Sequence, residues 1–425
     1  MPRTGPLRRK RKPEGNSAVR FEFDGRTHVG LADERVLTSL ICEDQLATSR
    51  SAKYRRARGA FCLRGDCGTC LVRIDGRPNR RACMERLHEG SRIESQNKIQ
   101  PDAFDPTRLV DLSFRSGIDH HHLMVKPRIA NQAMQTIARQ LTGLGTLPDG
   151  DADAAYGAVH REVEVLVIGA GPAGRAATKA LRDAGLQTLN IDRDPPPDAD
   201  ELVEALGVFG AYPLEGWWAA TAPTEPALHT LRARNVLLAL GSRDTMLPFP
   251  DNDRPGVVAA RGLAALLERD QLELEAHSVV VVGDDDFAGE MARRLESRLV
   301  ASSDVKGIVG SDRVRGIETK TGRIDCRFVA VAAPPAPAHE LAVMSGARTH
   351  FDGSGFAVVR DDEGRCGELH DAQVWAAGDL CGYVGPHAAA DDGLRVARAI
   401  IESYGGEIPT PPESPAATDS RGDRS

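Results

Sequence analysis

Residues 163–194, VEVLVIGAGPAGRAATKALRDAGLQTLNIDRD, indicate how the larger part of this chain folds. An apolar run typical of a buried strand leads into Gly169, Gly171 and Gly174, and a helical segment follows. A second apolar strand ends at Asp192. In such a βαβ unit the first glycine makes a tight turn, the second lets the backbone approach a pyrophosphate, and the third lets helix and strand pack closely. The phosphates lie at the helix N-terminus and the acid accepts hydrogen bonds from a ribose, so this stretch predicts a dinucleotide site.

Further short apolar strands follow along the chain. They are NVLLALG at 235–241, SVVVVGD at 278–284 and VWAAGD at 374–379. Because such runs are typical of parallel strands covered by helices on both faces, we expect an α/β fold from residue 161 onward.

Four cysteines earlier in the chain form a second pattern. In GAFCLRGDCGTCLVRIDGRPNRRAC at 59–83, Cys62, Cys67 and Cys70 have CxxxxCxxC spacing, and Cys83 follows. This is the ligand order of a plant-type [2Fe–2S] cluster, which needs four thiolates and a tight loop around it. Glycines at 59, 65 and 68 provide positive φ angles and close approach. The alternative, a zinc site, usually pairs one CxxC with another, and no second CxxC is present.

Composition and charge limit the other possibilities. The chain has 425 residues, a net charge of −7, 41% hydrophobic residues and 4% aromatic residues, so stacking on single-stranded nucleic acid is disfavoured. The sequence predicts no transmembrane segment and no signal peptide, and four of the eight cysteines are scattered singly, which together predict a cytoplasmic protein. Arginines between 50 and 81 either favour a reduced cluster and attract an acidic partner or form a solvated face.

Two motifs are similar to those of flavoproteins with two dinucleotide-binding domains. In VWAAGD, Asp379 resembles the aspartate that binds the flavin ribitol, and Gly378 gives close access. NVLLALGSR resembles the ATG motif of the same proteins, with Leu240 in place of threonine. The resemblance implies FAD; the alternative is a vestigial fold without cofactor. The expected FAD contacts are Gly169, Gly171, Pro172, Ala173, Gly174, Asp192, Arg193, Gly241, Gly378 and Asp379.

A third glycine motif, GDDDFAGE at 283–290, occupies the place of an NAD(P)H fingerprint. Asp285 replaces the middle glycine, and carboxylates at this helix N-terminus repel a pyrophosphate. The segment is also too short for a complete βαβ unit with a ribose-binding acid. We expect no working NAD(P)H site here.

Other segments carry weaker signals. The stretch between Asp192 and Asn235 predicts a short meander, in which Trp217 and Trp218 either belong to the core or close a site or face a partner. His120, His121 and His122 point in different directions in an extended segment, so a metal site there is disfavoured. Cys381 follows the GD motif and is expected to be a packed thiol, with a contact to the flavin as the alternative.

The predicted organisation combines a β-grasp ferredoxin-like domain with a Rossmann-like flavoprotein fold whose second domain is reduced. The boundaries are a disordered basic tail at 1–18, a [2Fe–2S] domain at 19–98, a linker at 99–160, an FAD-binding domain at 161–244 and 325–405, a degenerate NAD(P)-binding-like domain at 245–324 and a disordered tail at 406–425.

Residues 19 to about 405 resemble the alpha subunit of heterotetrameric sarcosine oxidase and related subunits of hydrogen cyanide synthase and opine oxidase type amino acid dehydrogenases. The similar stretches are SRSAKYRRARGAFC, GIDHHHLM, LTGLGTLPD and ARNVLLALGSRDTMLPFPDNDRPGVV. The resemblance implies an electron-transfer subunit with FAD and a [2Fe–2S] cluster, which acts on CH–NH substrates through a partner flavin subunit and an electron acceptor. No catalytic residues for substrate oxidation are identifiable. The alternatives are a self-sufficient NAD(P)H:acceptor reductase and a degenerate scaffold or redox-sensing subunit.

Overall fold

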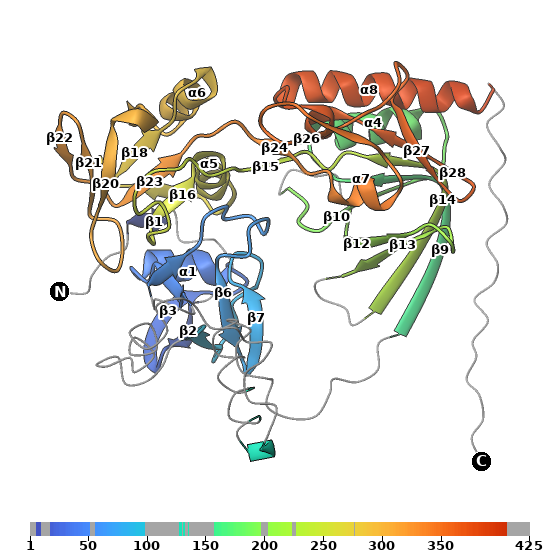
Figure 1. The fold of residues 1–425 in the computed structure, drawn as a ribbon. Helices are drawn as coiled ribbons and strands as arrows, with labels where there is room; N and C mark the ends of the chain where they lie inside the picture. Colours follow the sequence, from blue (N-terminus) through green and yellow to red (C-terminus); the bar gives the residue numbers. More distant parts are fainter. Residues whose placement is uncertain are drawn as a thin grey trace, which may run out of the picture. The chain divides into compact units, whose positions relative to one another are not determined.

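The computed structural model describes residues 6–9, 18–51, 56–97, 127–129, 131, 135, 157–196, 203–222, 227–275 and 277–405. These residues fold into two compact units (Figure 1). Unit 1 comprises Met1–Asp153 and Asp244–Pro334, and unit 2 comprises Ala154–Arg243 and Pro335–Ser425. The histidines at 120–122, most of the predicted linker and the C-terminal tail lie outside the described residues.

The first part of unit 1 is a five-stranded sheet in the order β3-β2-β8-β6-β7, accompanied by one helix. β2 and β8 are parallel, and the other neighbours are antiparallel. Val36, Leu37 and Leu40 of the helix are fully buried in the core. The elements are β2 (Ala18–Phe23), β3 (Arg26–Leu31), α1 (Val36–Cys42), β6 (Leu71–Ile74), β7 (Arg77–Arg81) and β8 (Arg92–Ser95), with a separate pair β4 (Ala47–Arg50) and β5 (Ala57–Gly59).

The second part of unit 1 is a parallel sheet in the order β16-β23-β18-β19, with two helices and a three-stranded antiparallel sheet. Its elements are β16 (Val257–Ala259), α5 (Ala260–Arg269), β18 (Val279–Val282), α6 (Asp286–Arg294), β19 (Arg298–Val300), η1 (Ser302–Asp304), β20 (Val305–Val309), β21 (Gly316–Thr319), β22 (Gly322–Ile324) and β23 (Phe328–Val331). β23 pairs with β16 and β18, so these residues belong to unit 1 and not to the FAD-binding segment predicted from residue 325.

The N-terminal tail was expected to be disordered, and this is wrong for Leu7–Arg9. These residues form β1, which pairs antiparallel with β17 (Leu272–Leu274). Leu7 is 2% exposed and packs in the same hydrophobic core as Leu272. One apolar residue in a basic stretch gives almost no strand signal, and the pairing partner lies over 260 residues away along the chain, so the local sequence could not reveal it.

Unit 2 is built on an eight-stranded sheet that contains the order β11-β10-β9-β14-β13-β12, with β28 pairing β14 and β27 pairing β28. β9 is parallel to β10 and β14. β14 is long enough to pair with β13 through its first half and with β28 through its second half. The strands are β9 (Gly157–Ile168), β10 (Thr188–Asp192), β11 (Val203–Ala205), β12 (Gly207–Tyr212), β13 (Trp217–Thr221), β14 (Ala227–Leu238), β27 (Arg365–Leu369) and β28 (Ala372–Ala376). β9 thus begins inside the predicted linker.

Helices α4 (Pro172–Asp183) and α8 (Pro386–Ser403) pack together on this sheet (Figure 1). Their close approach requires Gly393, because a Cβ there would lie 2.2 Å from the carbonyl oxygen of Ala173. The remaining elements are β15 (Ser242–Arg243), which pairs β24 (Ala336–Pro337), α7 (Glu340–Met344), the hairpin β25 (Thr349–Phe351) and β26 (Phe356–Val358), and η2 (Gly378–Cys381).

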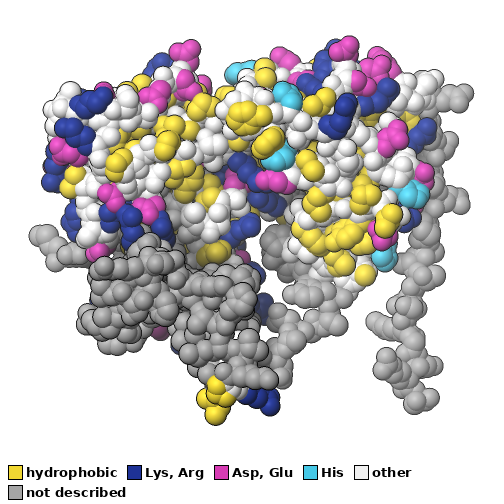
Figure 2. Space-filling view, in the orientation of Figure 1, with side chains coloured by type: hydrophobic (Ala, Val, Ile, Leu, Met, Phe, Trp, Pro, Cys, Tyr) yellow, Lys and Arg dark blue, Asp and Glu magenta, His cyan; other side chains and the backbone are white. Residues whose placement is uncertain are grey.

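The predicted meander is confirmed, since β12, β13 and β14 are successive antiparallel neighbours. Trp218 is 1% exposed and belongs to the core, whereas Trp217 is half-buried and stacks on Tyr212 with 4.5 Å between ring centroids. Phe209 and Leu214 are exposed, and Figure 2 shows hydrophobic side chains gathered where Figure 1 places β12 and β13. The hairpin therefore presents apolar surface.

Candidate cofactor sites

The cysteine loop of unit 1 is folded around its sulfur atoms. The backbone amides of Asp66 and Cys67 point at the Cys62 sulfur, at 3.2 and 3.3 Å, and the amide of Cys62 points at the Cys67 sulfur at 3.4 Å. On the other side, the sulfurs of Cys70 and Cys83 lie 3.4 Å apart. Amides directed at sulfur stabilise thiolate ligands and tune a cluster's potential.

The four thiols therefore form two pairs, Cys62 with Cys67 and Cys70 with Cys83. Among the described residues, no three His, Cys, Asp or Glu side chains are arranged to hold a single metal ion. Two pairs suit a two-iron centre, in which each iron takes two protein thiolates, better than a mononuclear zinc site. The residues present thus fit the predicted [2Fe–2S] cluster.

The pKa values of three thiols in the loop are shifted in different directions. The hydrogen bond with Cys62 and, after it, the one with Thr69 lower the pKa of the Cys67 thiol to about 5, although burial opposes this. The same hydrogen bond and burial raise the pKa of Cys62, and the hydrogen bond with Cys70 and burial raise that of Cys83. Cys67 is also the exposed member of the set, so the loop meets solvent there.

Arginines and glycines fix the loop. Arg35, which is 3% exposed, donates to the carbonyl oxygen of Cys83 at 2.6 Å, and Arg81 donates to that of Gly65 at 2.9 Å. Gly65 and Gly68 have φ angles of +87° and +67°, as the loop requires. Gly59 is needed for close approach instead, because a Cβ there would lie 2.7 Å from the carbonyl oxygen of Leu46.

Several arginines of the basic run are paired with acids of the 244–334 segment. Arg56 contacts Asp251 at 2.5 Å and Asp253 at 3.2 Å, and Arg58 also contacts Asp253. These ion pairs neutralise part of the positive charge near the cysteines, and they join the two parts of unit 1.

The first glycine turn of unit 2 has the geometry expected of a phosphate-binding turn. Gly169 has φ +112°, and a Cβ on it would lie 2.2 Å from the carbonyl oxygen of Ala239. A Cβ on Gly174 would lie 1.9 Å from the carbonyl oxygen of Gly169, whereas a Cβ on Gly171 would meet nothing within 4 Å. Gly171 is the N-cap of α4 and caps it with no side chain, so the space beside this helix N-terminus is open to a ligand.

The acid of the fingerprint lies at this turn. Asp192 ends β10, and its carboxylate accepts from the backbone amide of Ala170 at 2.8 Å and from that of Asp194 at 2.8 Å. It is half-buried, and each carboxylate oxygen can accept a further hydrogen bond. Pro172 and Ala173 open α4, and Arg193 follows Asp192.

The glycine–aspartate motif lies at the end of the neighbouring strands. Ala377 donates its amide to Leu238 and Ala239 donates to Ile168, so the ends of β28, β14 and β9 lie side by side. Ligands of open α/β sheets bind at such carboxyl ends, where the strand order reverses. The structure thereby brings the predicted residues Gly169 to Gly174, Gly241, Gly378 and Asp379 to one edge of the sheet.

The carboxylate of Asp379 already has partners. One oxygen accepts from the backbone amides of Val384 at 3.0 Å and Gly385 at 3.1 Å, and the other accepts from the Ser242 hydroxyl at 3.1 Å. Gly241, with φ +68°, has no neighbour within 4 Å of a Cβ position. These contacts hold Asp379 in place and leave room beside Gly241.

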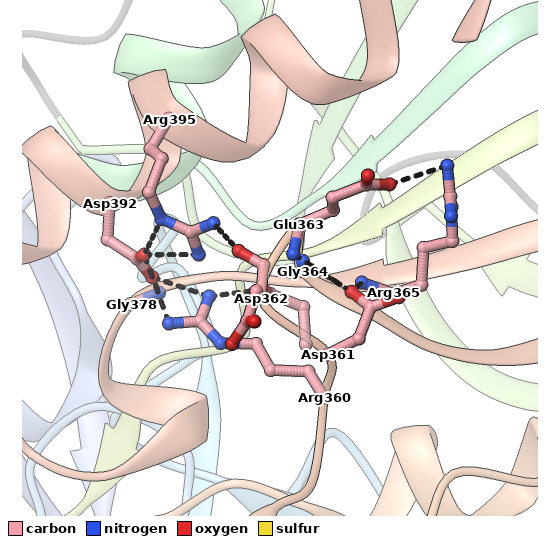
Figure 3. A network of polar contacts seen from close by, with 10 residues as sticks. Arg360, Asp361, Asp362, Glu363, Gly364, Arg365, Gly378, Asp392 and Arg395 are labelled. Atoms are coloured by element: carbon pink, nitrogen blue, oxygen red, sulfur yellow. Dashed lines mark hydrogen bonds and ion pairs between the residues drawn. The ribbon is translucent and has the colours of Figure 1, made fainter.

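A network that the sequence did not reveal supports this motif. Asp392 of α8 accepts from the backbone amide of Gly378 at 2.8 Å and from Arg360 at 2.8 and 3.0 Å, and Arg395 also donates to it (Figure 3). Burial alone would raise the pKa of Asp392, but the hydrogen bonds from Arg360, Gly378 and Arg395 outweigh it and lower the pKa. Asp392 lies 14 residues after Gly378, and no motif in the sequence indicates that the two residues form a hydrogen bond.

Cys381 directly follows Asp379 and Leu380 of this motif. Cys381 is half-buried and packs against the unit 2 core, and burial raises its pKa to about 11. This agrees with a packed thiol.

The third glycine motif has a different structure. Asp285 is the N-cap of α6, and its side chain accepts from the Ala288 amide at 2.9 Å. Asp284 accepts from the Ser302 amide at 2.8 Å. The segment was predicted to be too short for a complete βαβ unit with its ribose-binding acid; this is wrong for the framework, because β18, α6 and the three-residue β19 form a βαβ unit with parallel strands. β19 is followed by Ala301 and Ser302, so no acid stands directly after it.

Comparisons with known proteins agree with this domain arrangement. A family model described as a 2Fe-2S iron-sulfur cluster binding domain matches residues 16–98. Hydrogen cyanide synthase subunit HcnA of Pseudomonas aeruginosa is 35% identical over 86 residues, which are 20% of this chain and 82% of that protein. Sarcosine oxidase subunit alpha of Rhizobium meliloti (strain 1021) is 26% identical over 472 residues, 93% of this chain and 47% of that protein. This chain belongs to their family.

The members of this family differ in length, and this chain spans about half the length of the sarcosine oxidase alpha subunit that it matches. Among solved structures, L-proline dehydrogenase from P. horikoshii covers 96% of this chain and is itself covered to 77%, with a TM-score of 0.68 and 16% identity. The likeness confirms the fold class, a [2Fe–2S] domain with a Rossmann-like flavoprotein oxidoreductase fold. A [2Fe–2S] cluster and FAD, the two predicted cofactors, are the cofactors of these domain types. In the described part of the chain, no helix has the length and apolarity needed to cross a membrane.

Proposed function

We propose that this chain is the electron-transfer subunit of an amine or amino acid oxidising complex. In this proposal a partner flavoprotein oxidises the CH–NH substrate, and this chain passes electrons between FAD in unit 2 and a [2Fe–2S] cluster in unit 1. The observation that carries it is the paired arrangement of Cys62 with Cys67 and of Cys70 with Cys83, with backbone amides directed at the sulfurs. When bound, the two groups supply one-electron and two-electron redox chemistry.

The chain's own residues have separate roles in this proposal. Cys62, Cys67, Cys70 and Cys83 hold the iron, and the open helix N-terminus at Gly171 receives the FAD pyrophosphate. Asp192 would bind the ribose and Asp379 the ribitol. The partners named here are supported by the family relationship, since the relatives are called subunits, and by the exposed apolar hairpin that carries Phe209 and Leu214. We infer a cytoplasmic location from the free thiols and the cluster chemistry.

The first test measures the cofactors of the anaerobically purified chain. We expect two iron atoms, two sulfides and one FAD per chain, with cluster absorbance that bleaches on reduction. Cys67→Ser, at the exposed ligand, should lose the cluster, whereas Cys42→Ser, in α1, should keep it. An iron-free wild-type chain, or a Cys67→Ser variant with unchanged iron and spectrum, would contradict the proposal.

The second test separates this function from an NAD(P)H reductase. Asp285 fills the N-terminal position of α6 where a pyrophosphate would bind, so NADH should not reduce the isolated chain. Rapid bleaching of the flavin by NADH would favour the reductase instead. Cluster reduction that needs both an amino acid substrate and a co-purified flavoprotein would support the electron-transfer subunit.

A further inference from the structure

The 244–334 segment of unit 1 lies directly against the cysteine loop. The amide of Ala259, the N-cap of α5, donates to the carbonyl oxygen of Phe61 at 2.9 Å. A Cβ on Gly262, in the first turn of α5, would lie 2.2 Å from the carbonyl oxygen of Cys62. The first turn of α5 therefore packs closely against the backbone of Phe61 and Cys62.

A buried carboxylate stands at the same place. The Asp244 side chain is 6% exposed, and its Oδ1 accepts from Nε of Arg261 in α5 at 2.8 Å. Its Oδ2 is buried and makes no hydrogen bond, yet it lies 3.6 Å from Nε of Arg64. Arg64 belongs to the cysteine loop, two residues after Cys62, and its Nε also donates to Asp66 at 3.0 Å.

The charges on this loop have a direct redox consequence. A cation beside a cluster stabilises the reduced, more negative form, and a carboxylate on that cation offsets part of the effect. Because Asp244 is buried, solvent screens its charge poorly. The arrangement links α5 to the loop through one carboxylate, with Arg261 on one oxygen and Arg64 facing the other.

We propose that Asp244 is a positioning residue for the cluster: its buried carboxylate faces the Arg64 guanidinium, offsets part of that positive charge beside the loop and so lowers the cluster's reduction potential. The inference rests on the proposed function, since it needs a cluster on the four cysteines. It also assigns a role to the 244–334 segment, which holds and tunes the iron–sulfur domain. Asp66 bonds the same Nε at 3.0 Å, so removing the Asp244 charge leaves the guanidinium at the loop with less of its positive charge offset.

The test is a redox titration of the full chain followed by the cluster's EPR signal. Asp244→Asn keeps an acceptor for Arg261 and removes the charge. We expect at least a tenfold shift of the one-electron reduction equilibrium toward the reduced form, which is about 59 mV to more positive potential. Asp44→Asn is the matched control, because the Asp44 side chain is similarly buried, at 5% exposed, and pairs across the same two parts of unit 1 with Arg313 and Arg327; it should shift the equilibrium less than twofold.

The action through Arg64 is tested in a double-variant cycle. Arg64→Gln should lower the potential, and adding Asp244→Asn to it should produce less than half of the shift seen in the wild-type background. An unchanged potential in Asp244→Asn, or an equal shift in both backgrounds, overturns the inference. Should Asp244→Asn fail to fold, Arg64→Lys carries the test: it keeps the charge but loses the Nε contact, and a wild-type potential would overturn the inference. A wild-type chain without iron would instead refute the proposed function.

Discussion

The two glycine turns at 169–174 and 283–288 have the same strand–turn–helix framework, but the N-cap residues of their helices differ. In the first, Gly171 caps α4 without a side chain, and the space beside it is open. In the second, the Asp285 carboxylate caps α6 and occupies the amide of Ala288. Both turns keep the glycine that the packing requires, since a Cβ on Gly283 would lie 2.4 Å from the Cβ of Ala288. The N-terminus of a helix can thus bind a ligand or be capped by a side chain of its own segment, and the residue at the N-cap determines which.

The largest effect should come from transferring the second turn's carboxylate to the first. In Gly171→Asp the new charge faces the FAD pyrophosphate, and two like charges about 4 Å apart at an effective dielectric near 20 repel by about 4 kcal/mol. This weakens FAD binding by roughly three orders of magnitude. FAD absorbance after desalting and a fluorescence titration with FAD measure it. Gly171→Ala, which meets no protein atom, should stay folded and serve as control, and full FAD retention in Gly171→Asp would refute the assignment.

A smaller effect, on folding and not on binding, should come from Gly174→Ala. The added Cβ would lie 1.9 Å from the carbonyl oxygen of Gly169, so α4 must move away from β9. We expect a loss of about 3 kcal/mol in the free energy of unfolding. Urea unfolding of Gly174→Ala and Gly171→Ala side by side checks this. Equal stability of the two variants would show that the packing difference within the turn is unimportant.

An acid titration tests the unit that contains the first turn, because Asp392 bonds the backbone of Gly378 in that same unit. Its pKa is lowered in the folded state, so its contribution to stability is complete above the ordinary carboxyl pKa and disappears as the pH falls through the folded-state value. Losing charge-assisted hydrogen bonds of this kind costs about 2 kcal/mol. Unfolding monitored between about pH 5 and pH 2 should be less pH-dependent in Asp392→Asn than in the wild type. Parallel curves would contradict the role of this network.

The smallest effect should come from Asp285→Ala in the second turn, which removes the cap of α6. N-caps of this kind contribute about 1 kcal/mol. Thermal unfolding should detect the loss, and Asp285→Asn, which can still accept from Ala288, should retain most of the stability. A destabilisation by Asp285→Asn as large as that by Asp285→Ala would mean that charge and not capping is the main contribution.

The parts of the sites that sequence reasoning identified are those encoded within a few residues. The glycine turn at 169–174 and the cysteine spacing from Cys62 to Cys70 are local, so each residue's environment follows from its neighbours. Asp244, Gly262 and Asp392 could not be found in this way, because their partners Arg64, Cys62 and Arg360 lie at large separations along the chain. The predicted domain boundaries are wrong at β1 and β23 for the same reason, because the strands with which they pair lie far away along the chain.

Each compact unit is assembled from two stretches of chain that alternate with those of the other unit. During synthesis on the ribosome, the cysteine loop therefore emerges long before Gly262 and Asp244, against which it packs, and unit 2 waits for β28 and α8 until the whole of unit 1 has been made. The iron–sulfur segment is consequently made without the 244–334 segment that packs against its cysteine loop, until that segment follows. Cells that produce this protein would need cluster insertion to be timed to the completed chain, or to tolerate a nascent loop of reactive thiols.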